Sequence, residues 1–183
     1  EQSNAAGEAF AELTATVELL RYPGGCPWDA EQTHVSLRPN LLEETYETLE
    51  AIDSGDPKSL EEELGDIITQ IIFHADIARN EDNFDVASVC NAVREKLISR
   101  HPHVFGDAAA ATDSEEVVDN WEALKRAEAG GKRSIVASLP SAMPALAYSS
   151  SVQRRVMRAG LPWPEKHAMP LAFGSIEGES LEE

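Results

Sequence analysis

The residues of this chain best suited to chemistry are acidic side chains arranged as two matching pairs. Glu44 and Glu47 form the first pair, and Glu63 and Asp66 form the second, with a separation of three positions within each pair. Residues three apart lie on one face of an α-helix, so each pair presents two carboxylates in the same direction. Converging carboxylates repel one another unless a cation binds between them. The pattern predicts a metal site and, through the metal, a phosphate-containing substrate.

The ligand type indicates which metal to expect. Carboxylate oxygens favour hard cations, so we expect Mg²⁺, with Mn²⁺ as a substitute. Di-iron sites in helical bundles usually add a histidine three residues after a glutamate, and neither segment has one there. His74 lies about three turns beyond Glu63, and we interpret it as a packed or hydrogen-bonded side chain. The alternative is that all these acids form only the solvated face of acidic helices, as charge runs commonly do.

Two later pairs combine cationic and aromatic side chains. Lys96 and Arg100 are four positions apart, and Trp121 and Lys125 repeat that spacing. Arginine suits bidentate phosphate contact, lysine supplies a compact charge, and a tryptophan can stack on a base. We therefore predict substrate-binding roles for these residues. The alternative for each pair is structural, with surface charges in the first and a core tryptophan in the second.

The elements that must position these side chains are helices. Hydrophobic periodicity and breaker residues predict helices over 6–20, 40–54, 57–79, 85–100 and 114–129, with one more possible over 145–159. Asp56 is the predicted N-cap of the 57–79 helix. No stretch alternates like a strand, so we predict an all-α fold, an antiparallel helical bundle. We expect one domain over 6–130 and a linker-like C-terminal arm over 131–183.

An apolar stripe runs along each of the two helices that carry the acids. The stripes comprise Leu41, Leu42, Thr45, Leu49 and Ile52 on the first helix and Leu64, Ile67, Ile68, Ile71 and Ala75 on the second. At about 100° per residue, the acids lie at the edge of each stripe. We expect the two stripes to pack together, with the four carboxylates along one rim of the core. Gly65, between the second pair, is expected to allow close approach of another backbone or a ligand.

The composition limits the classes of partner. The chain has 183 residues, a net charge of −18 and a pI of about 4.6. Nucleic-acid backbones and anionic membranes repel such an acidic protein, so we expect no nucleic acid and no membrane as partner. A small polyphosphate remains compatible, because a divalent cation can bridge an acidic protein and an acidic ligand. Hydrophobic residues make up 42%, enough for a core.

The cysteines and the apolar runs bear on location. Cys26 and Cys90 are far apart and indicate neither a disulfide framework nor a metal-binding spacing. No apolar run reaches the length needed to cross a bilayer, and no signal-peptide pattern is visible. A cytoplasmic location is therefore expected.

Several short segments of the chain together carry a family resemblance. They are Gly25-Cys26-Pro27-Trp28-Asp29, Glu31-Gln32-Thr33-His34, Leu42-Glu43-Glu44-Thr45-Tyr46-Glu47, Glu62-Glu63-Leu64-Gly65-Asp66, Arg100-His101-Pro102-His103-Val104-Phe105 and Asn120-Trp121-Glu122. In this order they resemble the MazG family of nucleoside triphosphate pyrophosphohydrolases. The resemblance runs over about 12–128, and more loosely over 139–163. It implies an all-α fold completed by dimerisation, so that we expect a homodimer or higher homo-oligomer. It also implies Mg²⁺-dependent hydrolysis of nucleoside triphosphates to monophosphate and pyrophosphate, at the α–β phosphoanhydride.

The resemblance also assigns roles to residues. It implies metal ligation by Glu44, Glu47, Glu63 and Asp66, and phosphate or base contacts by Lys96, Arg100, Trp121 and Lys125. The residue that activates the attacking water would be Glu43 or Glu47, a choice that the sequence leaves open. Many family members carry two such domains in tandem, and this chain resembles the first. The alternatives are therefore a catalytically weak nucleotide-binding or dimerisation module of a larger tandem protein, and a helical interaction protein with a solvated acidic rim.

Overall fold

A computed structural model of the chain describes residues 2–106, 117, 121, 124, 136, 137 and 139–159. The chain forms two compact units, Glu1–Leu97 and Ile98–Glu183, and each is considered by itself. The regular secondary structure of the described residues is α-helical and includes no strand. The predicted all-α fold class is thereby confirmed, whereas dimerisation and the domain boundary at 130 stay predictions.

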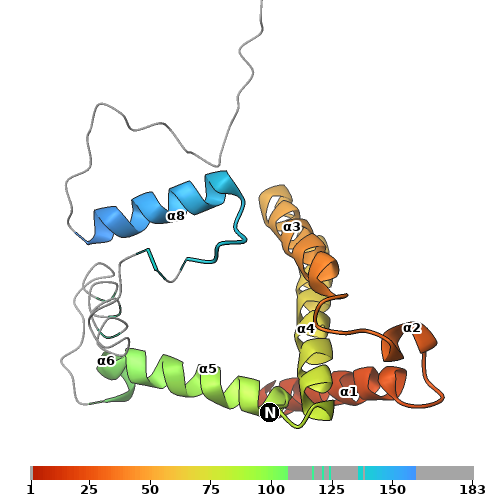
Figure 1. Cartoon of the computed structure of the whole chain (residues 1–183). Helices are drawn as coiled ribbons and strands as arrows, with labels where there is room; N and C mark the ends of the chain where they lie inside the picture. The colour runs from red at the N-terminus through yellow and green to blue at the C-terminus, as the bar shows by residue number, and fades with distance from the viewer. Residues whose placement is uncertain are drawn as a thin grey trace, which may run out of the picture. The chain divides into compact units, whose positions relative to one another are not determined.

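The first unit contains most of the helices (Figure 1). They are α1 Gln2–Arg21, α2 Pro27–Ala30, α3 Arg38–Ser54, α4 Pro57–Asn80 and most of α5 Val86–Arg100, while the second unit contains α6 Pro102–Phe105 and α8 Ala145–Arg158. The predicted helices over 6–20, 40–54, 57–79, 85–100 and 145–159 are confirmed, with small shifts at their ends. The short helices α2 and α6 were not predicted, and both begin with proline, which suits a first helical turn. Within the predicted helix over 114–129, the described residues Val117, Trp121 and Leu124 are helical, and the others lie outside the described residues.

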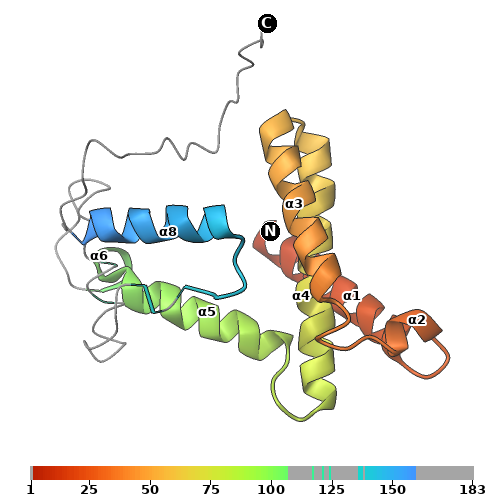
Figure 2. The same ribbon diagram turned by 45° about the horizontal axis from the view of Figure 1, so that its top comes forward.

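A tight connection makes α3 and α4 an antiparallel pair, visible side by side in Figures 1 and 2. Gly55 ends α3 with a φ of 69°, a left-handed conformation that glycine adopts without steric cost. Asp56 then caps α4, because its Oδ1 accepts a hydrogen bond at 3.0 Å from the backbone N–H of Lys58. The predicted cap is confirmed. Such a cap contributes about 1 kcal/mol and fixes where the acidic turn of α4 begins.

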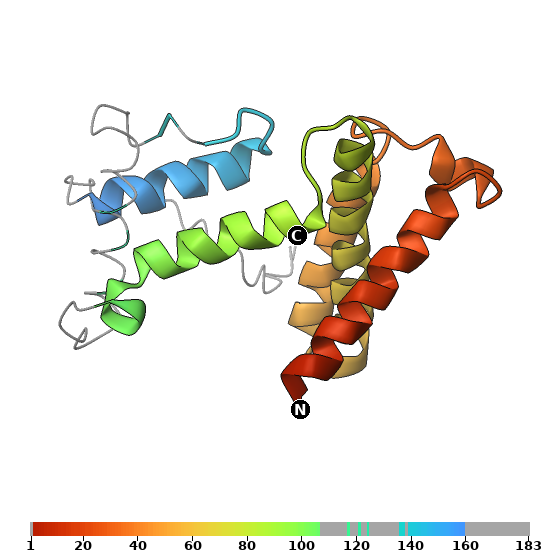
Figure 3. The ribbon, with the colours of Figure 1, turned by 90° about the horizontal axis from the view of Figure 1, so that it is seen from below.

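The core of the first unit lies where α1, the segment before α3 and the C-terminal half of α4 meet. Its buried side chains are Val17, Leu37, Ile72, Phe73 and Ile77. Figure 3 shows α1 alongside α4. Burying a side chain of this size contributes roughly 1.5–3 kcal/mol. The stability of this unit therefore concentrates at one end of the α3–α4 pair.

A buried ion pair holds the segment between α1 and α3 onto this core. The Nε of Arg21 donates to the Oδ2 of Asp76 at 2.7 Å, and both side chains are less than a tenth exposed. The same guanidinium donates to the backbone carbonyl of Asp29 at 2.6 Å. Gly25 lies so close to the end of α1 that a Cβ there would collide with the carbonyl oxygens of Leu19 and Leu20. One arginine thus ties together α1, α2 and α4.

The expected packing of the two apolar stripes on each other is wrong within a single chain. Leu42, Leu49 and Ile52 of α3 are more than half exposed, and Leu64 and Ile71 of α4 are more than two fifths exposed. The helices do lie together, but α3 buries Ala51 and α4 buries Gln70. These positions lie roughly a third of a turn from the centres of the stripes. Periodicity alone identified an apolar face, and it could not tell which element covers that face.

Gly65 has open space around it. A Cβ built there would meet no described atom within 4 Å. The expected close approach of another backbone is therefore not made by any residue that the structure describes. In the described part of the chain, no helix has both the length and the apolar character needed to cross a membrane.

Candidate metal centre

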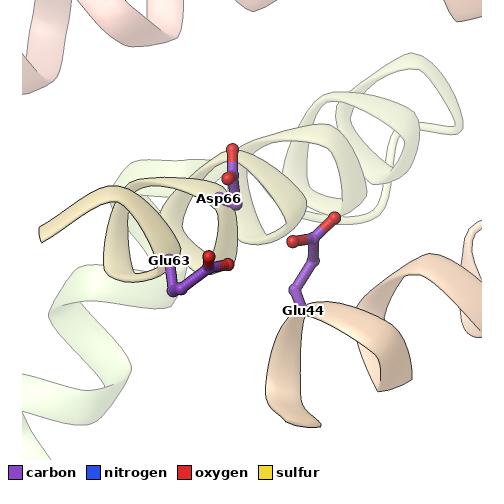
Figure 4. A group of neighbouring side chains, drawn as sticks. All are labelled: Glu44, Glu63 and Asp66. Atoms are coloured by element: carbon purple, nitrogen blue, oxygen red, sulfur yellow. The ribbon is translucent and has the colours of Figure 1, made fainter. Parts of the chain in front are cut away.

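Three of the predicted acids converge between α3 and α4. Glu44, Glu63 and Asp66 each offer a carboxylate oxygen, and these oxygens all lie within 4.8 Å of one another. Figure 4 shows Glu44 reaching from α3 towards the other two carboxylates on α4. The grouping predicted from spacing is therefore present in a single chain for these three residues.

Helical geometry explains how acids come to lie in a helix interface. At about 100° per residue, Glu44 shares the face of α3 that carries buried Ala51. On α4, Glu63 lies on the same face as buried Gln70. Glu44 and Glu63 are accordingly half-buried, whereas Asp66 is exposed. The acids are thus nearer the middle of the α3–α4 contact than the rim that the sequence suggested.

The electrostatics of this group favour a bound cation. Burial raises the pKa of Glu44, and the negative charges of Asp66 and Glu47 raise it further. Loss of solvation also raises the pKa of Glu63, together with the charges of Glu47 and Asp66. In both cases the surroundings penalise the ionised form. A divalent cation would reverse that penalty, because it replaces repulsion by attraction.

Glu47 and Glu43 differ in their relation to the group. The charge of Glu47 acts on both Glu44 and Glu63, so its carboxylate is close to those two. Glu47 is exposed on α3 and is not one of the three residues whose carboxylate oxygens lie within 4.8 Å of one another. Glu43 is also exposed and does not belong to the group. Of the two residues predicted to activate water, Glu47 is therefore the one beside the other acids.

The donor set fits magnesium. The three carboxylate oxygens lie within 4.8 Å of one another, so side-chain movement alone would bring them together around one small cation. The donors are all carboxylate oxygens, which suit Mg²⁺ or Mn²⁺ better than a softer metal. Glu44, Glu63 and Asp66 would hold such an ion, with Glu47 within reach.

The second unit brings together two of the predicted substrate-binding residues. The guanidinium carbon of Arg100 lies 5.4 Å from the centre of the Trp121 ring, a cation–π contact, and both side chains are half-buried. Lys96 is exposed on α5, one turn before Arg100. Lys125 lies outside the described residues. The sequence spacing predicts the pairs Lys96–Arg100 and Trp121–Lys125. The structure shows in addition that Arg100 of the first pair contacts Trp121 of the second.

Two polar features of the first unit were not predicted. The first is the Arg21–Asp76 ion pair, since nothing in the sequence marks these residues as partners. The second joins His34 to His74, whose Nδ1 atoms lie 2.8 Å apart. The interpretation of His74 as a hydrogen-bonded side chain is confirmed, but its partner could not be read from the sequence.

Comparison with known proteins agrees with this geometry. Residues 32–105, which include all three converging acids, match the family model of the MazG nucleotide pyrophosphohydrolase domain. The chain is 42% identical over 178 residues to the nucleoside triphosphate pyrophosphohydrolase/pyrophosphatase MazG of Thermotoga maritima, covering 97% of this chain and 67% of that protein.

Two further relatives show the same similarity. The chain is 42% identical over 154 residues to a nucleoside triphosphate pyrophosphohydrolase of Escherichia coli K12, covering 82% of this chain and 58% of that protein. It is 40% identical over 172 residues to the Mycobacterium tuberculosis protein of the same name, covering 93% of this chain and 50% of that protein. The chain thus spans between half and two thirds of these three relatives. With this identity over most of its length, the chain belongs to the MazG family.

Proposed function

We propose that this chain hydrolyses nucleoside triphosphates to nucleoside monophosphate and pyrophosphate in a Mg²⁺-dependent reaction. The observation that carries the proposal is the convergence of Glu44, Glu63 and Asp66 from two helices. The names of the relatives support the reaction class. The net charge of −18 supports a metal-bridged ligand, because a bare triphosphate would be repelled.

Each acidic residue has its own role in the proposed hydrolysis. Glu44, Glu63 and Asp66 hold the metal, which when bound supplies charge neutralisation for the triphosphate oxygens. Glu47, exposed beside them, accepts a proton from the attacking water. The water oxygen bonds to the α-phosphorus, and the bond from that phosphorus to the α–β bridging oxygen breaks. The bridging oxygen leaves with the pyrophosphate.

The other predicted residues are proposed to bind the substrate. Arg100 and Trp121, which form a cation–π contact, would contact phosphate and stack on the base respectively. Lys96 and Lys125 would add positive charge to the phosphate contacts.

A second copy of the chain is the proposed partner. Large apolar side chains of α3 and α4 are exposed in this acidic molecule, including Leu42, Leu49, Ile52, Leu64 and Ile71. Apolar surface gathered on two adjacent helices is typical of an interaction site. A homodimer formed through this face would bury the stripes that the single chain leaves exposed, and would place two acidic groups in one assembly.

The decisive experiment measures pyrophosphate release from each nucleoside triphosphate with and without Mg²⁺. We expect release by the native chain and loss of release in Glu44→Gln and Glu63→Gln. Glu61→Gln is the matched control, because Glu61 is an exposed acid of the same helix outside the group. Equal release by all four proteins would contradict the proposed role of the acids.

A nucleotide-binding or dimerisation module is the second candidate. The observation that favours it is that the chain spans only part of its relatives, down to 30% of the YabN protein of Bacillus subtilis. Mg²⁺-dependent nucleotide binding by calorimetry, without pyrophosphate release under the same conditions, would establish this alternative.

A further inference from the structure

His34 and His74 meet in an unusual geometry. Their Nδ1 atoms are 2.8 Å apart, the ring planes differ by 7°, and the ring centres are 5.1 Å apart. Two parallel rings stacked face to face cannot bring ring nitrogens this close, because the rings themselves would overlap. The centre-to-centre distance instead matches two ring radii added to the Nδ1–Nδ1 contact. The imidazoles therefore lie nearly edge to edge in one plane, with the two nitrogens pointing at each other.

This arrangement requires one proton between the two rings. A hydrogen bond between nitrogens needs one Nδ1–H donor and one bare Nδ1 acceptor. If both rings carry a proton on Nδ1, two donors face each other and two positive charges lie side by side. The lone pairs are also directed at one another instead of at a third point, so a shared proton fits this geometry better than a chelated cation.

The surroundings make additional charge on this pair costly. Within the part of the chain that the structure describes, the Nε2 of His74 is buried without a hydrogen-bond partner, and so is the Oε1 of Gln70, one turn earlier on α4. A charged His74 would thus present a second, unpaired N–H in a buried position. Burial lowers the pKa of His74, and the neighbouring His34 lowers it further. The structure favours a neutral pair.

Several of the charges near these elements pair with one another. The charged side chains of the surrounding elements include Glu18 and Arg21 of α1, Asp29 of α2, Glu31 and Arg38 at the approach to α3, and Asp76 and Arg79 of α4. Arg21 and Arg79 both pair with Asp76, and Arg79 also pairs with Glu18. Among the described residues, no hydrogen bond or ion pair joins any of these to either imidazole. The pair therefore depends on its own protonation.

The pair connects two parts of the fold that matter for the acids. His34 belongs to the turn that leads into α3, where the backbone N–H of Leu37 donates to Thr33 O at 3.2 Å and that of Leu41 donates to Leu37 O at 3.0 Å. His74 belongs to the C-terminal half of α4, on the same helix as Glu63 and Asp66. The hydrogen bond thus fastens the start of the helix that carries Glu44 to the helix that carries its partners.

We propose that His34 and His74 form a proton-sensitive contact, which holds the start of α3 on α4 while one proton lies between the two Nδ1 atoms and releases it when both imidazoles are protonated. We call this contact the latch. The latch is a positioning device for α3. Its effect on metal binding, through the alignment of Glu44 with Glu63 and Asp66, rests on the proposed function. The latch itself does not, and it can be tested without turnover.

The first test is amide hydrogen exchange at pH 7.5 and pH 5.0, corrected for the intrinsic pH dependence of exchange. These values lie on either side of the ordinary histidine pKa of about 6.5. We expect the protection of the Leu37 and Leu41 amides to fall roughly fivefold to tenfold at pH 5.0 relative to that of Ile72 in α4, the factor that corresponds to the loss of one hydrogen bond. In the His34→Phe/His74→Phe double variant this difference should vanish. Equal relative protection at both pH values in the native chain would overturn the latch.

The second test needs no variant. Nitrogen-15 spectra of the histidine rings at pH 7.5 should show one protonated and one bare Nδ1 for this pair, and the coupling between them should disappear on acidification. Two bare Nδ1 atoms at pH 7.5, or a pair that persists unchanged at pH 5.0, would show that the rings are only packed together. Pyrophosphate release plays no part in either measurement, so failure of the latch and failure of the proposed reaction are separate results.

Discussion

Arg21 of α1 and Asp76 of α4 form an ion pair in which the Nε–Oδ2 distance is 2.7 Å and the side chains are 7% and 4% exposed. Such a pair is seldom a large net source of stability, because both charges lose their hydration. The main effect of this ion pair is to fix the position of the chain. The same arginine donates to the backbone of Asp29, so the pair fixes the path of the chain between α1 and α3 on which the acidic helices depend.

Removing one member of this pair should cost more than removing both. Arg21→Met leaves Asp76 with only Arg79 and Asn80 as side-chain partners. We expect a loss of roughly 1–3 kcal/mol in the free energy of unfolding, because the buried carboxylate of Asp76 loses one charged hydrogen-bond donor and keeps Arg79. The double variant Arg21→Met/Asp76→Leu should recover part of this loss. Urea unfolding of the three proteins gives the comparison, and a double variant less stable than the single one would contradict the argument.

The effect of Glu44→Gln on stability should depend on whether Mg²⁺ is present. The pKa of Glu44 is raised in the fold, so the folded chain binds more protons than the unfolded chain, and stability falls as pH rises through the interval above the ordinary glutamate pKa. Glu44→Gln removes that repulsion. Without metal at pH 7.5 we expect the variant to melt at a higher temperature than the native chain.

With Mg²⁺ the order should reverse. A ligand at a hundred times its dissociation constant stabilises the native state by about 2.7 kcal/mol, and Glu44→Gln loses that gain. Thermal unfolding with EDTA and with Mg²⁺ provides the measurement. Glu61→Gln should respond to Mg²⁺ like the native chain, because Glu61 is outside the group. An identical order of melting temperatures in both conditions would count against a metal at this site.

The two candidate bases can be separated by matched substitutions on one helix. Glu47 lies close enough to raise the pKa values of Glu44 and Glu63, whereas Glu43 is exposed and outside the group. We expect Glu47→Gln to lower kcat by a factor of about 10² or more, the usual contribution of a general base. Glu43→Gln should retain most of the activity. Steady-state kinetics of pyrophosphate release decide between them, and the opposite ranking would move the role to Glu43.

The exposed apolar face should govern the oligomeric state. Ile52 of α3 and Leu64 of α4 are 54% and 46% exposed. If a second copy covers this face, Ile52→Glu and Leu64→Glu bury a charge in an apolar contact, and we expect each variant to shift from dimer to monomer in light scattering after size exclusion. Leu19→Glu is the control, since Leu19 of α1 is 72% exposed and lies outside the two stripes. A native chain that is monomeric throughout would refute the proposed dimer.

Local features of this fold were predictable from the sequence, and long-range partners were not. Gly55 and Asp56 determine the end of α3 and the start of α4 through their own backbone and side chain, so the sequence revealed both. The acid pairs were recognisable because three-residue spacing has a fixed geometrical meaning on a helix.

The remaining features depend on contacts between distant segments. His34 and His74 are 40 positions apart, and no periodicity links them. The apolar stripes were assigned to the interior of the chain because apolar faces are usually buried, but the α3–α4 contact uses Ala51 and the half-buried acids instead. A sequence pattern reports how apolar a face is, and the element that covers it is a property of the whole assembly.

Gly65 offers a direct test of what approaches α4 beside the acids. No described atom lies within 4 Å of a Cβ at this position, and glycine in a helix interior costs roughly 0.5–1 kcal/mol relative to alanine. If the position faces only solvent, Gly65→Ala should raise the free energy of unfolding by about that amount without affecting assembly. If a second copy or a ligand packs there, the added methyl group should weaken dimerisation or nucleotide binding. Urea unfolding together with light scattering and calorimetry distinguishes the two outcomes. We expect the stabilising result, because the single chain provides open space at this point of the helix.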